Sequence, residues 1–313
     1  MMRALGKSGL STPPLVLGGN VFGYTADRAA SFAVLDAFMA GGGTMIDTAD
    51  VYSAWVPGHK GGESETVIGE WLKRRGRRDD VLIATKVGML PGEGGEGLAP
   101  ARIAAAVEAS LTRLGTDYID LYYAHKDDPA TPMDASLRAL DALVKAGKVR
   151  ALGASNFAHH RLDEALATAA HGDLTPYTVL QPEYNLVARK DFEGPVQQLA
   201  IDRGLGVLPY FGLASGFLTG KYRTAADLQG RERGESVKTY LNARGLSVIG
   251  AMDVIARESG ATHAQIALAW IAAQPGVTAP IASATDVGQM EELLGAMRLT
   301  LSAEQIAVLN ATG

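Results

Sequence analysis

The chain has 313 residues, 47% of them hydrophobic, which is enough apolar side chain to bury one large core. Its formal net charge of -5 argues against a nucleic-acid partner, which usually requires a basic face. The lack of cysteine excludes disulfides, thiolate metal sites and cysteine nucleophiles. Because no run has the apolar length of a secretory signal or a membrane span, we expect an intracellular, cytoplasmic protein.

Short β-rich runs alternate along the chain with amphipathic helical segments. Residues 3–13 come first and predict a small hairpin, turning at residues 6–9, that plugs the bottom of a barrel. Residues 81–85 form a short apolar run, which is typical of a buried parallel strand. Residues 101–114 follow and place their apolar side chains on one helical stripe. This alternation indicates parallel strands joined by helical crossovers.

Eight such units can be counted. The expected strands lie near residues 15–18, 43–47, 81–86, 119–124, 149–154, 177–181, 206–210 and 277–281. We therefore predict an α/β protein, a (β/α)8 TIM barrel with an N-terminal β-hairpin and extra helices and loops, as one domain over residues 1–313. The charged segment 222–234 has few large apolar side chains and predicts a mobile excursion.

Unusual polar residues follow the ends of these expected strands. They are Asp47 and Tyr52 after the second strand, Lys86 at the third, His125 at the fourth, Ser155 and Asn156 at the fifth, Gln181 at the sixth and Tyr210 at the seventh. Barrel enzymes build their active sites at the carboxyl ends of the strands. The pattern therefore predicts an active site at this face.

The same residues lie in motifs that resemble those of the aldo-keto reductases. The motifs are IDTADVY at residues 46–52 with GESE at 62–65, ATKVG at 84–88, DYIDLYYAH at 117–125, GASNF at 153–157, QPEYN at 181–185 and GFLTGKY at 216–222. Several motifs in one order are more specific than any of them alone. Their spelling is similar to the bacterial, potassium-channel-β-subunit-like branch of the family.

The resemblance implies a catalytic set of four residues, Asp47, Tyr52, Lys86 and His125. A carbonyl that accepts hydride develops negative charge and needs a proton, which Tyr52 would donate. Lys86 would lower the pKa of the Tyr52 phenol, and Asp47 would hold Lys86 in place. His125 would orient the substrate carbonyl through a hydrogen bond.

The resemblance also implies NADPH (NADP+) as the cofactor. Ser155, Asn156 and Gln181 would hold the nicotinamide carboxamide, and Tyr210 would stack on the ring. The rest of the expected cofactor set is Gly19, Asn20, Phe211, Leu213, Gly216, Lys221, Ser283, Thr285 and Gln289. Many relatives have a basic residue at the position of Thr285, which pairs with the 2′-phosphate of NADPH. Because Asp286 follows Thr285 here and would repel that phosphate unless turned away, NADH is a possible cofactor.

Trp55 and Met89 predict an apolar wall of the substrate pocket, with loop packing as the alternative for Trp55. Residues 92–97 formally match G-x-G-x-x-G, but this loop is too long for the tight turn and its glutamates would repel a pyrophosphate. It predicts a flexible loop bordering the pocket instead. The histidines show no metal-ligand spacing, and no metal is expected.

The sequence thus predicts an NADPH-dependent oxidoreductase that reduces an aldehyde, ketone or sugar carbonyl to the alcohol, with Tyr52 as general acid. Two alternatives stay open. One is an NAD-linked sugar (aldose) dehydrogenase, and the other is a cofactor-bound sensor or binding subunit with vestigial catalysis. The expected partner is a small carbonyl compound, with no nucleic acid or membrane, and the chain is expected to be a monomer or small homo-oligomer.

Overall fold

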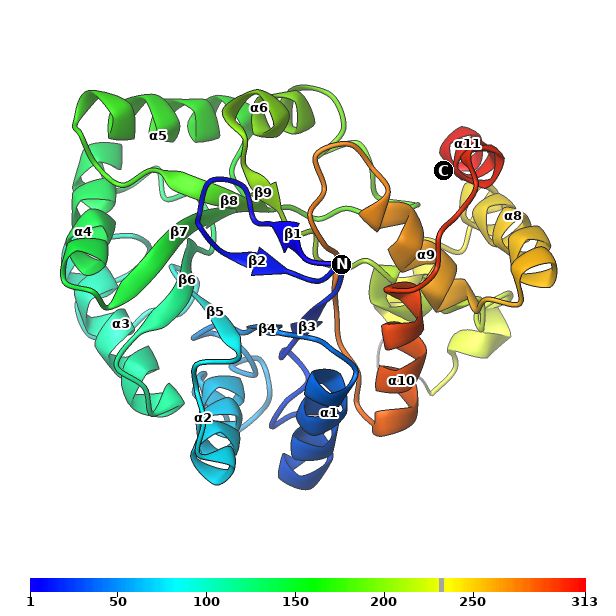
Figure 1. Cartoon of the computed structure of the whole chain (residues 1–313), viewed down its shortest axis with the longest axis horizontal. Coiled ribbons are helices and arrows are strands. Elements are labelled where there is room, and N and C mark those ends of the chain that lie inside the picture. The colour runs from blue at the N-terminus through cyan, green and yellow to red at the C-terminus, as the bar shows by residue number, and fades with distance from the viewer. Residues whose placement is uncertain (231–233) are drawn as a thin grey trace.

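Eight parallel strands frame the molecule in the computed structural model, which describes residues 1–230 and 234–313. They are β3 (Val16–Gly18), β4 (Met45–Asp47), β5 (Leu82–Val87), β6 (Ile119–Ala124), β7 (Val149–Ser155), β8 (Tyr177–Gln181), β9 (Gly206–Val207) and β10 (Ile281–Ala282). Their order is β10-β3-β4-β5-β6-β7-β8-β9. The predicted barrel is confirmed, and Figure 1 shows its strands inside a surround of helices.

The barrel closes between β9 and the segment that leads into β10. The Thr278 N–H donates to the Val207 carbonyl over 2.9 Å, and the Ile281 N–H donates to the Pro209 carbonyl over 2.8 Å. The seventh strand is shorter than the expected range 206–210, and the eighth overlaps the expected range 277–281 only at Ile281. Pro209 and Pro280 explain this, because proline has no N–H to continue a ladder.

Helices cover the outside of the barrel. The surrounding layer consists of α1 (Arg28–Ala40), α2 (Glu63–Arg75), α3 (Pro100–Leu114), α4 (Met133–Lys145), α5 (His159–His171), α6 (Pro195–Arg203), α9 (His263–Ala272) and α10 (Val287–Ala296). Two further helices, α8 (Ala243–Ser259) and α11 (Ala303–Thr312), pack against each other beyond α9 (Figure 1). The helices predicted at 101–114 and 133–146 are confirmed to within one residue.

The N-terminal hairpin plugs the amino end of the barrel, as predicted. Its strands are β1 (Arg3–Ala4) and β2 (Ser11–Thr12), which pair antiparallel. Leu5 and Leu10 join the apolar cluster inside the barrel, next to the first residues of the strands. Gly6 has a left-handed φ of 55°, and an added Cβ would lie 2.2 Å from the Gly206 amide, so only glycine fits there.

The described part of the segment 222–234 is bound to the rest of the molecule at its start. Tyr222 is buried, and Arg223 binds Asp253 of α8 through two bonds of 2.8 Å. A short 3-10 helix (η2, Ala225–Leu228) follows, and α7 (Gly234–Lys238) begins at the end of the segment. The predicted excursion is thus fastened to α8 at its start, while residues 231–233 lie outside the described residues. Among the described residues, no helix has the length and apolar character that crossing a bilayer requires.

Candidate active site

A fully buried lysine lies at the centre of the polar residues at the carboxyl ends of the strands. Lys86 ends in an ammonium that donates to Asp47 Oδ2 over 2.6 Å, to the Thr48 carbonyl over 2.8 Å and to the Tyr52 hydroxyl over 2.9 Å. A buried ammonium without acceptors would cost several kcal/mol, and these three oxygens offset that cost. Lys86 of β5 can therefore remain charged inside the barrel, because β4 and the loop that follows it provide its hydrogen-bond acceptors.

His125 follows β6 and lies against the phenol of Tyr52, with ring centroids 6.1 Å apart at 72°. Its Nδ1 is buried and has no hydrogen-bond partner. Burial, with the nearby ammonium of Lys86 and that of Lys126, holds the pKa of His125 well below its usual value. The imidazole is therefore neutral at neutral pH and can donate one hydrogen bond to a ligand beside Tyr52.

The pKa of Tyr52 differs from the sequence-based expectation. Burial of the hydroxyl and the negative charge of Asp47 raise the pKa of Tyr52 well above its usual value. The net shift is opposite to the expected lowering by Lys86, because burial disfavours the phenolate and the carboxylate repels it, and together they outweigh the ammonium. The phenol stays protonated at neutral pH, which is the form that can give a proton away.

Left-handed backbone is concentrated around this face of the barrel. Among non-glycine residues, Ser53 follows Tyr52 with φ 73°, Asn156 follows β7 with φ 56°, and Phe211 lies beyond β9 with φ 56°. Ala214 and Ser215 add φ values of 47° and 57°. Such conformations cost about 1–3 kcal/mol each and collect at functional sites. The strain therefore marks the loops that the sequence assigned to the acid and to the cofactor.

The residues expected at the nicotinamide form a connected polar row. Asn156 donates to the His125 carbonyl over 2.9 Å and accepts from the Tyr210 hydroxyl over 2.7 Å. Ser155 donates to the Gln181 carbonyl over 2.8 Å. Gln181 in turn donates through Nε2 to Asp47 Oδ1 over 2.8 Å. The row joins the carboxyl ends of β6, β7 and β8 to the catalytic candidates.

The residues expected at the other end of the nucleotide form two groups. Ser283 is hydrogen-bonded to Asn20, which brings β10 beside the loop after β3. The Thr285 hydroxyl donates to the side-chain oxygen of Gln289 over 3.2 Å. Asp286 accepts from the backbone N–H of Gln289 over 2.9 Å. Asp286 is thus the N-cap of α10, and its carboxylate is turned toward its own helix.

The segment after β9 is exposed at its two ends and partly buried between them. Phe211 and Lys221 are exposed, and Leu213 and Gly216 are half-buried. Residues 214–219 form the 3-10 turn η1, and Gly216 adopts φ 97°. Gly19, by contrast, is packed: its N–H donates to the Asp47 carbonyl over 2.7 Å, and an added Cβ would lie 2.8 Å from Ser64 Oγ. The structure gives Gly19 a packing role next to Asp47.

Aromatic rings line one side of the space in front of Tyr52. Trp55 lies edge-on to Tyr52 with centroids 6.2 Å apart, and edge-on to Tyr24 at 6.3 Å. Trp55 is 53% exposed and Met89 is 39% exposed, although both are large and apolar. Apolar surface of this kind beside a polar centre is typical of a ligand-binding wall.

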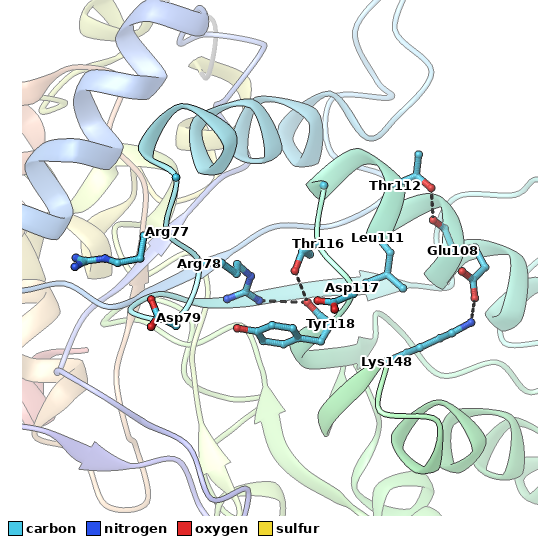
Figure 2. Close-up of a pocket in the computed structure, with 12 residues that line it drawn as sticks. Arg77, Arg78, Asp79, Glu108, Leu111, Thr112, Thr116, Asp117, Tyr118 and Lys148 are labelled. Carbon is cyan, nitrogen blue, oxygen red and sulfur yellow. Dashed lines mark hydrogen bonds and ion pairs between the residues drawn. The ribbon is translucent and has the colours of Figure 1, made fainter.

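A hollow at the opposite end of the barrel differs in chemistry from the site around Lys86. It has a volume of about 1030 Å³ and lies among the loops that precede β5, β6 and β7 (Figure 2). Its cations are already engaged: Arg77 with Asp80, Arg78 with Asp120, and Lys148 with Glu108. It collects no strand-end polar groups of the kind found around Lys86. The described residues also contain no cluster of three or more His, Asp or Glu that could hold a metal ion.

Comparison with known proteins assigns the family. The model of the Aldo/keto reductase family matches residues 14–312. The chain belongs to this family. It is similar to a probable voltage-gated potassium channel subunit beta of Arabidopsis thaliana, at 34% identity over 94% of this chain and 90% of the relative. The uncharacterized oxidoreductase YrpG of Bacillus subtilis is also 34% identical, over 98% of this chain and 94% of the relative.

Another relative has a named substrate. An L-glyceraldehyde 3-phosphate reductase of Escherichia coli O157:H7 is 31% identical over 97% of this chain and 90% of the relative. These relatives confirm the resemblance to the bacterial and channel-subunit-like branch. An oxidoreductase of the aldo/keto reductase type, acting on small carbonyl compounds, is the activity class that this family membership supports.

Three residues around the site were not singled out from the sequence. Tyr24 faces Trp55, and the buried pair Asp50 and Arg102 lies behind the loop of Tyr52. Arg102 shares a helical face with Ala106, Ser110 and Arg113 at spacings of four, eight and eleven residues. Two arginines on a face of small residues indicate buried acidic partners, and this signal was present in the sequence.

Proposed function

We propose that this chain reduces the carbonyl group of a small aldehyde, ketone or sugar to the alcohol, using a nicotinamide nucleotide as hydride donor. The observation that carries the proposal is the buried Lys86 ammonium, which lies 2.6 Å from Asp47 and 2.9 Å from the Tyr52 hydroxyl. His125 adjoins the same phenol. Such a cluster can donate a proton to the substrate oxygen and can stabilise the negative charge that develops during the reaction, and carbonyl reduction requires both.

The four side chains divide the work of moving one proton. Tyr52 holds it on the phenol oxygen, where the raised pKa keeps it until negative charge develops on the substrate oxygen. Lys86 touches the phenol oxygen and stabilises the tyrosinate that forms. Asp47 fixes the position of Lys86. The neutral imidazole of His125 donates a hydrogen bond that orients the carbonyl oxygen.

The donor set beyond β7, β8 and β9 fits a nicotinamide nucleotide. Asn156, Ser155 and Gln181 present amide and hydroxyl groups suited to a carboxamide, and the half-buried ring of Tyr210 offers a stacking surface. The exposed Lys221 and the 3-10 turn η1 suit a pyrophosphate. When bound, this nucleotide would supply the hydride. We propose NADPH as the nucleotide, in keeping with the sequence resemblance.

A second candidate keeps the fold and changes the nucleotide and direction of reaction. Asp286 places a carboxylate at the N-terminus of α10, beside Thr285, where a 2′-phosphate would need a positive group. This observation favours NADH, and with it an NAD-linked sugar dehydrogenase. Dissociation constants for NADPH and NADH, measured by cofactor fluorescence, distinguish the two candidates. Tighter binding of NADH would overturn the proposal of NADPH.

The experiment that tests the function compares wild type with Tyr52→Phe. We expect wild type to oxidise NADPH in the presence of at least one member of an aldehyde and ketone panel. Removing the hydroxyl should lower kcat by about 10²–10⁴-fold while the dissociation constant of NADPH stays within about twofold. If wild type binds the nucleotide but reduces no member of the panel, the chain is a sensor or binding subunit and the proposed function is wrong.

A further inference from the structure

A buried ion pair lies directly behind the loop that carries Tyr52. The Asp50 side chain is fully buried, and its Oδ2 accepts a bond from Arg102 of α3 over 3.4 Å. Asp50 Oδ1 and Arg102 Nε, both buried, have no hydrogen-bond partner. A pair that leaves two polar atoms unsatisfied is a poor stabilising device, because each costs about 1–3 kcal/mol. Its geometry therefore calls for an explanation other than stability.

Arg102 also holds the loop of residues 88–98, which follows β5. Its second terminal nitrogen donates to the Glu93 carbonyl over 3.1 Å. Gly92 lies so close to this guanidinium that an added Cβ would be 2.7 Å from it. Gly92 and Gly95 exchange two backbone hydrogen bonds, of 3.1 and 3.0 Å, and so shape the loop tip that Arg102 grips. The loop expected to be flexible is fastened in its middle.

Asp50 connects this grip to the proposed proton donor. Its backbone N–H donates to the Lys86 carbonyl over 3.3 Å, and it precedes Tyr52 by two residues. Gly61 follows Tyr52 in the same loop with a left-handed φ of 89°, and an added Cβ there would lie 2.7 Å from the Asp50 carbonyl oxygen and 2.9 Å from Leu90 of the 88–98 loop. The loop of Tyr52 and the loop of Leu90 therefore approach each other beside the backbone of Asp50.

We propose that Arg102 is a positioning residue, which fastens the 88–98 loop to the Tyr52 loop through Asp50 and so shapes the substrate side of the pocket. The kinetic consequences of this inference rest on the proposed function. The contact of Arg102 with the two loops does not depend on that function. Arg102 touches neither Tyr52 nor Lys86 within the hydrogen bonds of the described residues, so it acts through Asp50 and the Glu93 carbonyl.

The charges around Asp50 make the fastening dependent on pH. The groups that act on Asp50 are Glu65 from α2, Arg102 and Arg113 from α3, Lys86 from β5 and Tyr122 from β6. Burial, followed by the charge of Glu65, raises the pKa of Asp50 to about 7. Above that pH the Asp50 carboxylate is charged and forms an ion pair with Arg102. Below that pH Asp50 is neutral, and its interaction with Arg102 weakens.

The first test measures the loop without any turnover. Hydrogen–deuterium exchange of peptides covering residues 88–98 is compared among wild type, Arg102→Met, Arg102→Lys and the control Arg138→Met. Arg138 lies on the neighbouring helix α4, pairs with Asp134 at the surface and is not among the groups that act on Asp50. We expect about tenfold faster exchange in Arg102→Met, partial recovery in Arg102→Lys, and wild-type exchange in Arg138→Met. Unchanged exchange in Arg102→Met, or an equal rise in Arg138→Met, would overturn the proposal.

The second test uses steady-state kinetics with whichever carbonyl compound wild type reduces. Arg102→Met should raise KM about tenfold or more with a smaller change in kcat, because a displaced loop weakens substrate positioning. Asp50→Asn should remove an inflection near pH 7 from the pH profile of KM, and an inflection that persists counts against the proposal. If no compound is reduced but exchange still rises in Arg102→Met, the proposed function fails and the fastening stands.

Discussion

Gln181 Nε2 donates a hydrogen bond to Asp47 Oδ1 across the mouth of the barrel, over 2.8 Å. The two residues end β8 and β4, which are four places apart in the order of eight strands and therefore face each other. Asp47 uses its other oxygen for Lys86. Both carboxylate oxygens are thus held from different walls of the barrel, and the direction of the Lys86 ammonium depends on the whole circle of strands.

Gln181→Leu should therefore lower kcat even though Gln181 touches neither Tyr52 nor Lys86 in the hydrogen bonds described. A hydrogen bond to a charged group is worth about 1.5–3 kcal/mol, so we expect kcat to fall by about ten- to hundredfold. The control is Gln198→Leu, which removes an exposed glutamine bound to Asp202 on α6. Equal kcat values for Gln181→Leu and wild type would show that Asp47 does not need its second anchor.

Lys86→Met should destabilise the fold as well as abolish activity. The substitution leaves the buried Asp47 carboxylate without its cation, which costs about 3–5 kcal/mol in the free energy of unfolding. The double variant Lys86→Met/Asp47→Asn should recover at least half of that loss but none of the activity. Urea unfolding of the two single variants and the double variant completes the cycle. A double variant as unstable as the sum of the singles would contradict the pairing.

The fold was predictable because the spacing of apolar side chains along this chain follows the periods of strands and helices. The run 81–86 and the stripe of 101–114 each fit one element, and alternation fixes the parallel topology. The ends of the last strands were not predictable from hydrophobicity. Pro209 and Pro280 stop the ladder there, although their neighbours still close the barrel through backbone bonds.

The candidate site was predictable to the extent that it follows strand ends. Asp47, Lys86 and His125 meet because the carboxyl ends of parallel strands meet. The pKa of Tyr52 was not predictable, since the sequence indicates a nearby ammonium but not the depth of burial that outweighs it. Nor did spacing alone connect Arg102 to Asp50, because their contact depends on how α3 packs behind the Tyr52 loop.

Gly153→Ala should be costly, although it adds a single methyl group. Gly153 lies in β7, and an added Cβ would be 2.4 Å from the ring of the fully buried Tyr123. We expect a loss of about 1–3 kcal/mol in the free energy of unfolding, because neighbouring strands cannot separate to admit the methyl group. Gly250→Ala in α8 is the control, since nothing lies within 4 Å of its added Cβ. This control should gain up to about 1 kcal/mol from helix propensity, and urea unfolding measures both.

The buried His125 should make the protein sensitive to mild acid. The folded state holds the pKa of His125 well below its usual value, whereas in the unfolded chain the same imidazole has a pKa of about 6.5. The unfolded state therefore binds more protons as pH falls below that value, and stability is lost. His125→Gln should reduce this loss between about pH 7 and pH 5. Equal slopes of unfolding free energy against pH in both proteins would contradict a neutral, buried imidazole.

Asp286→Asn should shift nucleotide preference toward NADPH while leaving α10 intact. Asparagine caps a helix about as well as aspartate, so the bond from the Gln289 backbone N–H is retained, whereas the negative charge and the oxygen that accepts from Gln289 Nε2 over 2.7 Å are removed. We expect the dissociation constant for NADPH to fall about two- to fivefold, with that for NADH unchanged, since a charge at a helix terminus contributes about 0.3–1 kcal/mol. The matched control is Asp27→Asn, because Asp27 caps α1 in the same way by accepting from the Ala30 amide. Fluorescence titration of both variants separates a local effect on the 2′-phosphate from a general effect of net charge, and a similar shift in the control would remove Asp286 from nucleotide selection.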